Sequence, residues 1–352
     1  MKFANGKVTV AGDTAVAAPT ERATSSYTVD RSMGPVLSFN TYNDIFHFLG
    51  EPTYGNIEGE QGDWEFVITK LTEDSIFVKG KKWENEMVFT RMADGVDWTS
   101  YLDSIADVQK RLGVNYSVGN SSDASKMVEI NSATRRILSR TADGQMVEQP
   151  FYVTPTGIHA VNEPVALGED KAQDFLVSKA GVMTAKDNED LTLNSYAPGI
   201  DTWVGEWTLS AMQGSCDMTI SKVEDQENML KGTFTAGGYT YNIGLSFNPE
   251  TGALNLPSQL IEDPSGRYPA LWLMNADLNQ GTLLGQGGMN VVWHGVSQEG
   301  DFEDDGTLAS EGYASDSFVA LACTADGEII KENNQFVFVV EWYFLSNLTP
   351  NK

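Results

Sequence analysis

The densest acidic stretch of the sequence, residues 299–306, carries carboxylates at a spacing that suits a cation. Asp301, Glu303 and Asp305 stand at alternate positions before a glycine, like the oxygen ligands in the first half of a calcium loop. The second half departs from that pattern, because Gly312 occupies the position of the bidentate glutamate. The stretch therefore predicts either a weak Ca²⁺ site or a charged hairpin tip, and the sequence indicates no other cofactor.

Aromatic side chains are the second group whose type suits ligand binding. Exposed rings stack on sugars or line apolar pockets, whereas rings that alternate inward along strands fill a core. Both interpretations stay open for the aromatic residues of the C-terminal half, and any one exposed Trp would be informative. The candidate ligand-binding residues are Trp203, Trp207, Tyr239, Tyr241, Trp272 and Trp293.

Signatures of enzymatic catalysis are sparse in this sequence. The three histidines, His47, His159 and His294, lie far apart in the chain, so the zinc motif His-Glu-x-x-His does not occur. Phosphate-binding glycine loops and the Gly-x-Ser-x-Gly turn of many hydrolases are absent as well. Paired carboxylates stay an open alternative, because their separation in space is invisible in a sequence. We assign no catalytic residue and expect a protein that is not an enzyme.

Composition narrows the classes of partner. The 49 acidic residues against 23 basic ones give a net charge of -26, which repels nucleic acid. No stretch approaches the roughly 18 consecutive apolar residues of a membrane-spanning helix. Only Cys216 and Cys323 are present, which excludes a disulfide framework and leaves open whether the two thiols pair.

The elements that must position these residues are mostly strands. Alternating β-branched and aromatic residues predict an antiparallel meander over 64–71, 75–79 and 87–92. One amphipathic helix is predicted over 97–112, where apolar residues recur at three- and four-residue steps behind Asp97 as the N-cap.

The C-terminal half reads as roughly nine short strands with turn residues between them, a pattern typical of a barrel or sandwich. The run 336–345 is apolar at both alternating sets of positions, so we expect one strand that is central or closes a barrel and that pairs with an early strand of this half. A polar stretch at 184–190 marks the boundary between domains. The sequence therefore predicts a mainly β fold with two antiparallel barrel or sandwich domains, at 1–190 and 197–352.

Several segments of the first half also occur together in a known family. Gly-Pro-Val-Leu-Ser-Phe-Asn-Thr-Tyr-Asn at 34–43, Gly-Asp-Trp-Glu-Phe-Val at 62–67, Val-Lys-Gly-Lys-Lys at 78–82 and Pro-Phe-Tyr-Val-Thr-Pro-Thr-Gly-Ile at 150–158 carry the similarity. Over roughly residues 1–180 the chain resembles Bacteroidetes cell-surface lipoproteins that contain a domain of unknown function and a lipocalin-like N-terminal part. The resemblance implies export and a lipid anchor in the outer membrane, beside polysaccharide or peptide uptake systems.

This sequence lacks the leader and the lipid-bearing cysteine of such precursors, so we expect the anchor in a full-length precursor. We expect a non-enzymatic, surface-anchored binding lipoprotein for a glycan, a peptide or an apolar small molecule. Two alternatives are kept: a hydrolase that uses paired carboxylates, and a structural or adhesive partner of an outer-membrane uptake complex. No nucleic-acid partner is expected.

Overall fold

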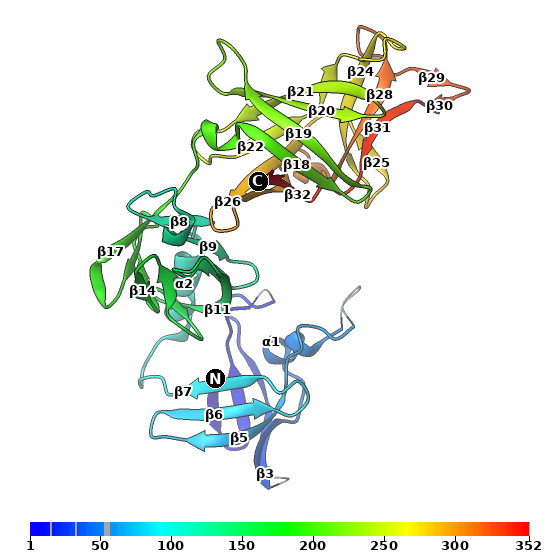
Figure 1. The fold of residues 1–352 in the computed structure, drawn as a ribbon. Helices are drawn as coiled ribbons and strands as arrows, with labels where there is room; N and C mark the ends of the chain where they lie inside the picture. Colours follow the sequence, from blue (N-terminus) through cyan, green and yellow to red (C-terminus); the bar gives the residue numbers. More distant parts are fainter. Residues whose placement is uncertain (15, 32–33, 53–56, 352) are drawn as a thin grey trace. The chain divides into compact units, whose positions relative to one another are not determined.

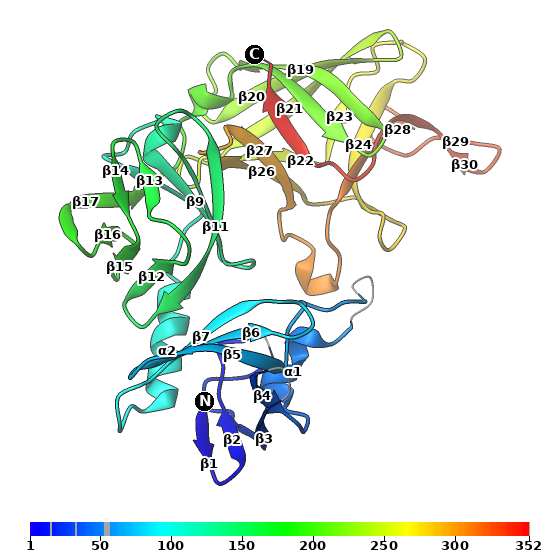
Figure 2. The ribbon, with the colours of Figure 1, turned by 60° about the horizontal axis from the view of Figure 1, so that its bottom comes forward.

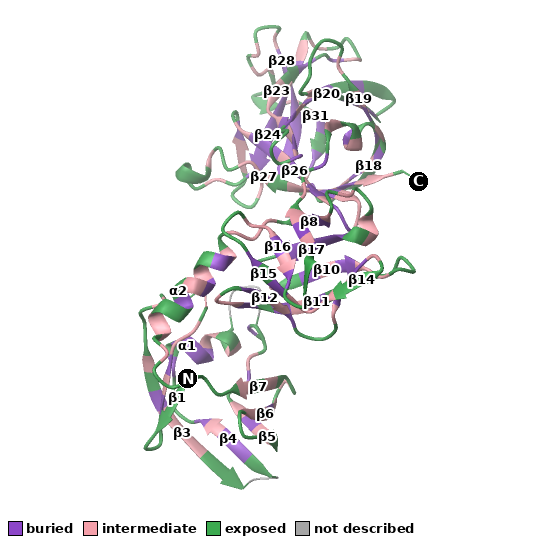
Figure 3. Ribbon diagram, turned by 90° about the vertical axis from the view of Figure 1, so that its left-hand side faces the viewer, coloured by how far each residue is buried: buried purple, intermediate pink, exposed green. Residues whose placement is uncertain are grey.

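The structure, a computed structural model, describes residues 1–14, 16–31, 34–52 and 57–351. The chain is mainly β, and it divides into one compact unit of residues 1–111 with 153–158 and a second of residues 112–152 with 159–352. Buried and exposed positions alternate along many of the strands, and the turns are mostly exposed (Figure 3). No helix in the described part of the chain is long and apolar enough to cross a membrane.

An open seven-stranded sheet, the N-terminal sheet, forms the first unit. Its strands lie in sequence order, and each pairs antiparallel with the next. Val8, Phe39 and Phe66 are in its buried core. The strands are β1 (Lys2–Ala4), β2 (Lys7–Val10), β3 (Ala23–Arg31), β4 (Pro35–Phe39), β5 (Glu65–Leu71), β6 (Ser75–Gly80) and β7 (Glu86–Thr90).

Short helices connect and follow this sheet. Helix α1 (Asp44–His47) and the 3₁₀ turn η1 (Phe48–Gly50) lie between β4 and β5. Helix α2 (Trp98–Gln109) begins where the side chain of Asp97 accepts a hydrogen bond from the Ser100 N–H. The predicted meander and the predicted amphipathic helix are both confirmed.

An eight-stranded closed barrel, the N-terminal barrel, follows α2 in the chain. Its strand order is β10-β11-β12-β15-β16-β17-β8-β9, and inward positions such as Ile130 and Leu193 are fully buried. The strands are β8 (Asn115–Val118), β9 (Met127–Asn131), β10 (Arg136–Arg140), β11 (Met146–Thr154), β12 (Gly157–Ala160), β15 (Asp174–Val177), β16 (Met183–Ala185) and β17 (Asn188–Ser195). A separate hairpin pairs β13 (Val165–Leu167) with β14 (Asp170–Ala172), and the 3₁₀ turn η2 (Ala124–Lys126) precedes β9.

A second closed barrel, the C-terminal barrel, also has eight strands. Its last strand in the chain closes it by pairing with β18 on one side and with β27 on the other. The strands are β18 (Gly205–Ala211), β19 (Gly214–Lys222), β20 (Met229–Ala236), β21 (Tyr239–Phe247), β22 (Leu254–Pro257), β26 (Gly288–His294), β27 (Glu299–Asp304) and β32 (Asn347–Pro350). The 3₁₀ turn η3 (Ile200–Trp203) leads into β18.

A five-stranded sheet, the accompanying sheet, shares its hydrophobic core with the C-terminal barrel. It runs β23 (Gln259–Ile261), β24 (Ala270–Asp277), β28 (Ser317–Cys323) and β31 (Phe338–Trp342), with β25 (Thr282–Leu284) paired to β24. The 3₁₀ turn η4 (Ala309–Glu311) precedes β28. A small hairpin of β29 (Lys331–Glu332) and β30 (Gln335–Phe336) projects from the end of this sheet (Figures 1 and 2).

The predicted strand 336–345 differs from this arrangement. The span 1–190 holds the N-terminal sheet and the N-terminal barrel, and the domain boundaries 1–190 and 197–352 stay a prediction. The run 336–345 is interrupted at Val337 and again after Trp342, and Phe344 has a φ of 48°. Because that left-handed conformation breaks an extended strand, β31 joins the accompanying sheet and the separate strand β32 closes the barrel.

Candidate functional site

Three of the predicted ligand-binding residues form one group, the buried tryptophan cluster of Trp203, Trp207 and Trp293. The ring centroids are 5.5 Å apart for Trp203 and Trp207, 5.4 Å for Trp203 and Trp293, and 6.2 Å for Trp207 and Trp293. The cluster is at most 5% exposed. Gly300 leaves room for it, since a Cβ there would lie 2.7 Å from the Trp203 ring.

Backbone oxygens accept hydrogen bonds from two of the three indole N–H groups of this cluster. The Trp203 indole N–H donates to the Gly252 carbonyl at 2.8 Å, and the Trp207 N–H donates to the Trp203 carbonyl at 2.8 Å. Buried indoles with both their faces and their N–H groups occupied belong to the packed core of the barrel. Their role in ligand binding stays an untested prediction.

The other three candidate aromatic residues lie apart from that cluster. Tyr241 is buried and stacks on Phe234 with 5.2 Å between ring centroids, whereas Tyr239 is 46% exposed at the start of β21. Trp272 is partly buried in β24, and its buried indole N–H has no hydrogen-bond partner among the described residues. Of the six candidates, only Tyr239 has a largely accessible ring.

The acidic stretch forms β27 and the turn after it. Asp301 lies 3.3 Å from the Nε2 atom of His294, and Asp305 accepts a hydrogen bond from the Thr307 N–H at 2.9 Å. Glu303 is exposed. Within residues 1–14, 16–31, 34–52 and 57–351, no group of three or more His, Cys, Asp or Glu side chains is arranged to hold a metal ion. The same part of the chain leaves Cys216 and Cys323 as free thiols.

The turn between β26 and β27 meets the N-terminal barrel in a polar contact that we call the barrel clasp. The buried carboxylate of Glu129 accepts hydrogen bonds from the N–H groups of Val296 and Ser297. The Asn115 side chain donates to the Trp293 carbonyl and accepts from the Gly295 N–H at 2.9 Å. Two side chains of one barrel therefore replace the backbone partners that this turn of the other barrel lacks.

His294 supplies the positive charge of the barrel clasp. Its Nδ1 atom lies 3.2 Å from Glu129, and Asp301 flanks Nε2 on the other side. The Asp301 carboxylate and the Glu129 carboxylate raise the pKa of His294 to about 10, against the opposing effect of burial. At neutral pH the ring is therefore an imidazolium held between two carboxylates. A histidine that keeps its proton in this way binds the barrels together and is a poor general base.

An accessible aromatic group lies elsewhere, in the first unit. Trp64, at 38%, is the one tryptophan of the eight that is classed as exposed. It stacks on His47, with 5.3 Å between ring centroids and 28° between planes. Tyr42, 57% exposed, packs on the same imidazole at 5.4 Å and 33°. We call Tyr42, His47 and Trp64 the aromatic platform.

Local structure fixes each ring of the platform. His47 is buried at the end of α1, and its Nδ1 atom accepts a hydrogen bond from the Asn43 N–H at 3.1 Å. A Cβ on Gly50 would lie 2.4 Å from the Trp64 ring, so only glycine lets η1 approach that closely. The buried carboxylate of Asp63 accepts a hydrogen bond from the Lys82 N–H at 2.8 Å, which holds the backbone beside Trp64.

Carboxylates border the Tyr42 end of the platform. The Tyr42 hydroxyl donates a hydrogen bond to Glu51, which raises the pKa of Tyr42, with smaller contributions from burial and from the charges of Glu51 and Asp44. The platform thus has two exposed aromatic rings, and the Tyr42 hydroxyl and the Glu51 carboxylate at its edge can form hydrogen bonds. Sequence reasoning missed it, although Trp64 follows the Gly-Asp step singled out above, because exposure cannot be read from residue type.

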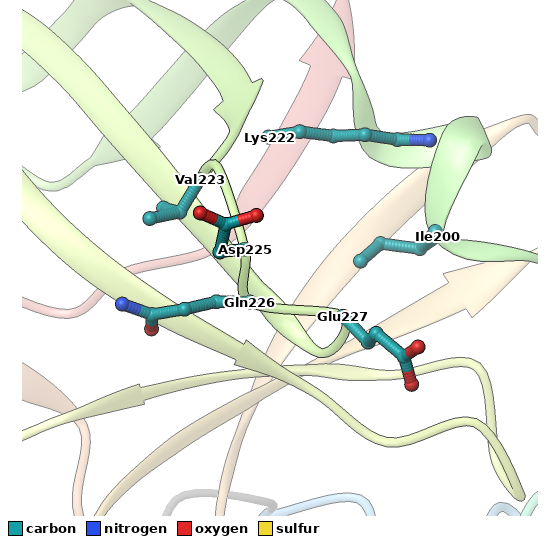
Figure 4. Close-up of a pocket in the computed structure, with 6 residues that line it drawn as sticks. All are labelled: Ile200, Lys222, Val223, Asp225, Gln226 and Glu227. Carbon is teal, nitrogen blue, oxygen red and sulfur yellow. The ribbon is translucent and has the colours of Figure 1, made fainter.

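Hollows are shallow in the described part of the molecule. One of about 590 Å³ is lined by Ile200 of η3 and by polar side chains at the end of β19, with Lys222 extending toward η3 (Figure 4). Lys222 forms an ion pair with the exposed Asp201. A second hollow of about 180 Å³ lies between the β18–β19 turn and β31.

Comparisons with known proteins identify the family of this chain. No curated protein matches the chain. A solved structure of a mosquitocidal holotoxin aligns at 8% identity with a TM-score of 0.17, covering 96% of this chain and 48% of the toxin chain, so this chain spans about half the toxin's length. A TM-score that low carries no argument. The family model described as a domain of unknown function (DUF4302) matches residues 1–179, half of the sequence, and the chain therefore belongs to the DUF4302 family.

Proposed function

We propose that this protein is a non-enzymatic binding lipoprotein of the cell surface, and that it holds a glycan on the aromatic platform. The observation that carries the proposal is the accessible Trp64 ring, stacked on a buried histidine and flanked by Tyr42. A large apolar ring exposed to water costs free energy unless a ligand covers it, and this one is held rigidly by its neighbours.

A sugar ring matches the chemistry of this surface. The C–H face of a pyranose packs on an aromatic ring, and its hydroxyls need donors and acceptors at the rim. Trp64 supplies the ring, while the Glu51 carboxylate and the Tyr42 hydroxyl supply hydrogen bonds at the edge. Because His47 packs on both Tyr42 and Trp64, we expect the ligand to lie on the ring faces that His47 leaves free.

Anchoring and export belong to the same proposal. They are supported by the resemblance of residues 1–180 to surface lipoproteins of Bacteroidetes, which implies a lipid-bearing cysteine in the precursor. The up-and-down order of the N-terminal sheet supports a relationship to lipocalins, whose barrels share that order. Metabolic labelling of the full-length precursor with palmitate, followed by fractionation of the cells, tests this part. An unlabelled protein in the soluble fraction would contradict it.

Glycan binding has its own test. We expect the protein to bind members of a glycan array, and isothermal titration with the best oligosaccharide to show at least a tenfold loss of affinity in Trp64→Ala. Trp98→Ala is the matched control, because Trp98 is a partly buried residue of α2 in the same unit. Silence across the array, or equal affinity of Trp64→Ala and the wild type, would count against the proposal.

Of the alternatives, the structural or adhesive partner has one observation in its favour. Met212 and Phe344 are exposed, and each lies within two residues of one that lines the second hollow. The hydrolase with paired carboxylates has no such observation in its favour. The carboxylates of Glu129 and Asp301 lie on either side of the His294 imidazolium, which already pairs with both.

A further inference from the structure

One edge of the accompanying sheet is left unpaired. In the described part of the chain β31 pairs with β28 alone. On its other side, the Tyr343 N–H donates to the Gln213 side chain and the Tyr343 carbonyl accepts from the Met212 N–H. Alternate residues of a strand direct their backbone groups to the same side, so the N–H and C=O of Glu341 also face this edge. An open edge of this kind can accept a further strand.

Exposed apolar side chains border this edge. Met212 is 66% exposed, Phe338 44% and Phe344 38%. Phe344 has a φ of 48°, a conformation that a bulky aromatic residue rarely adopts, and its N–H is held by the Ser317 hydroxyl at 2.8 Å. The fold therefore maintains a strained backbone at a residue that leaves much of its ring in water, which is a feature typical of binding surfaces.

A hollow of about 180 Å³ opens beside the same edge. Its apolar wall consists of Leu209 and Cys216 from the C-terminal barrel and Trp342 from β31. These residues face inward at the end of the barrel, where Trp342 packs on Phe234 with 4.5 Å between ring centroids. The volume suits one aliphatic side chain of a bound segment.

The negative charge at this edge favours a basic partner. Glu341 is the single charged residue among those lining the hollow. The Tyr343 hydroxyl donates to its carboxylate, and that hydrogen bond raises the pKa of Tyr343 to about 12. The whole chain has a net charge of -26. A basic segment is therefore attracted both by Glu341 and by the field of the molecule.

We propose that β31 is a docking edge for an extended, basic peptide segment of a partner protein, which adds a strand beside Glu341 and places an apolar side chain in the hollow. Main-chain hydrogen bonds to the edge hold the segment, the hollow selects an apolar residue, and Glu341 selects a Lys or Arg two residues away on the strand. This surface is separate from the aromatic platform and does not depend on glycan binding.

A synthetic acetylated hexapeptide of alternating Val and Lys tests the proposal on the full chain. We expect it to bind by isothermal titration, and we expect hydrogen exchange to show new protection of the β31 amides. A hexapeptide of alternating Val and Glu is the charge control. An absence of binding by the Val–Lys peptide, or protection elsewhere without protection of β31, would overturn the proposal.

Two substitutions separate edge docking from general attraction to an acidic protein. Glu341→Gln keeps a hydrogen-bond acceptor for Tyr343 and removes the charge, and we expect at least a fivefold loss of affinity for the Val–Lys peptide. Glu303→Gln removes an exposed charge from β27 and is the matched control, with affinity unchanged. Equal losses in the two variants would show that the peptide responds to net charge alone, and would also overturn the proposal.

Discussion

Two groups of three aromatic rings in this protein have similar spacing and opposite environments. The buried tryptophan cluster has every indole face packed and the N–H groups of Trp203 and Trp207 bonded to backbone oxygens. The aromatic platform leaves the rings of Tyr42 and Trp64 accessible and pairs the Tyr42 hydroxyl with a carboxylate. The difference shows that the proximity of aromatic rings does not distinguish a core cluster from a binding surface. The partners of their polar atoms and the accessibility of their faces do distinguish the two.

Removing the central ring of the buried cluster is expected to have the largest effect. Trp203→Ala should lower the free energy of unfolding by about 3–5 kcal/mol, because it leaves a large cavity in the C-terminal barrel. Urea unfolding followed by circular dichroism measures this loss. A change below about 1 kcal/mol would mean that the cluster is not part of the core, and the comparison with the platform would fail.

Weakening the barrel clasp is expected to have the next largest effect on stability. Glu129→Gln removes one of the two carboxylates that face the His294 imidazolium, next to Trp293. Breaking a buried ion pair costs about 3–5 kcal/mol, and we expect the lower end because a quarter or so of the His294 side chain is accessible. Asp301→Asn, at the more exposed partner, should cost less. Differential scanning calorimetry of the two variants compares their losses of stability. A larger loss in Asp301→Asn than in Glu129→Gln would show that Glu129 is not the main partner of His294.

Alkaline pH is expected to weaken the same region. The pKa of His294 is about 10 in the folded protein and near its ordinary 6.5 in the unfolded chain. The stabilisation is therefore complete below about pH 6.5 and is lost as the pH rises toward 10, at up to about 1.4 kcal/mol per pH unit. Unfolding free energies of the wild type and His294→Gln, measured between these limits, should converge at high pH. Parallel curves would contradict the assignment.

The platform is expected to give the inverse pattern. Trp64→Ala should lower the free energy of unfolding by about 1–2 kcal/mol, less than Trp203→Ala, because Trp64 is 38% exposed and buries only part of its ring on folding. Urea unfolding of this variant, set beside its glycan affinity, sharpens the contrast with Trp203. A loss of several kcal/mol would identify Trp64 as a core residue.

The smallest effect is expected at the edge of the platform. Tyr42→Phe keeps the ring on His47 and removes the hydroxyl that donates to Glu51. We expect a two- to fivefold loss of glycan affinity, in keeping with about 0.5–1 kcal/mol for one hydrogen bond, and no measurable change in unfolding. An unchanged affinity would confine recognition to the ring faces.

Local sequence patterns predicted the elements of this fold well. Alternation gave the strands of the meander, and the cap at Asp97 gave the start of α2. Many short strands with regular turns predicted barrels or sandwiches, and the structure has two closed barrels. The break at Phe344 was missed, because the apolar pattern of residues 336–345 continues through a residue whose backbone turns left-handed.

The candidate sites were less predictable for a physical reason. The contact between Glu129 and His294 joins residues 165 positions apart, and no local pattern encodes such a pairing. Burial of the six candidate aromatic residues depends on which side of a barrel wall they face. Trp64 differs from Trp207 in accessibility, although each lies two residues after a glycine in the sequence.

The closure of the C-terminal barrel by β32 has a consequence for how the protein folds. β18 pairs on one side with a strand that lies far along the chain, and Thr208 hydrogen-bonds Asn351 across 143 positions of sequence. A partly folded chain in which β32 has not yet docked leaves one side of β18 and one side of β27 unpaired. Such a chain can exchange strands with neighbouring copies, and the pairing of residues 347–350 removes that opportunity.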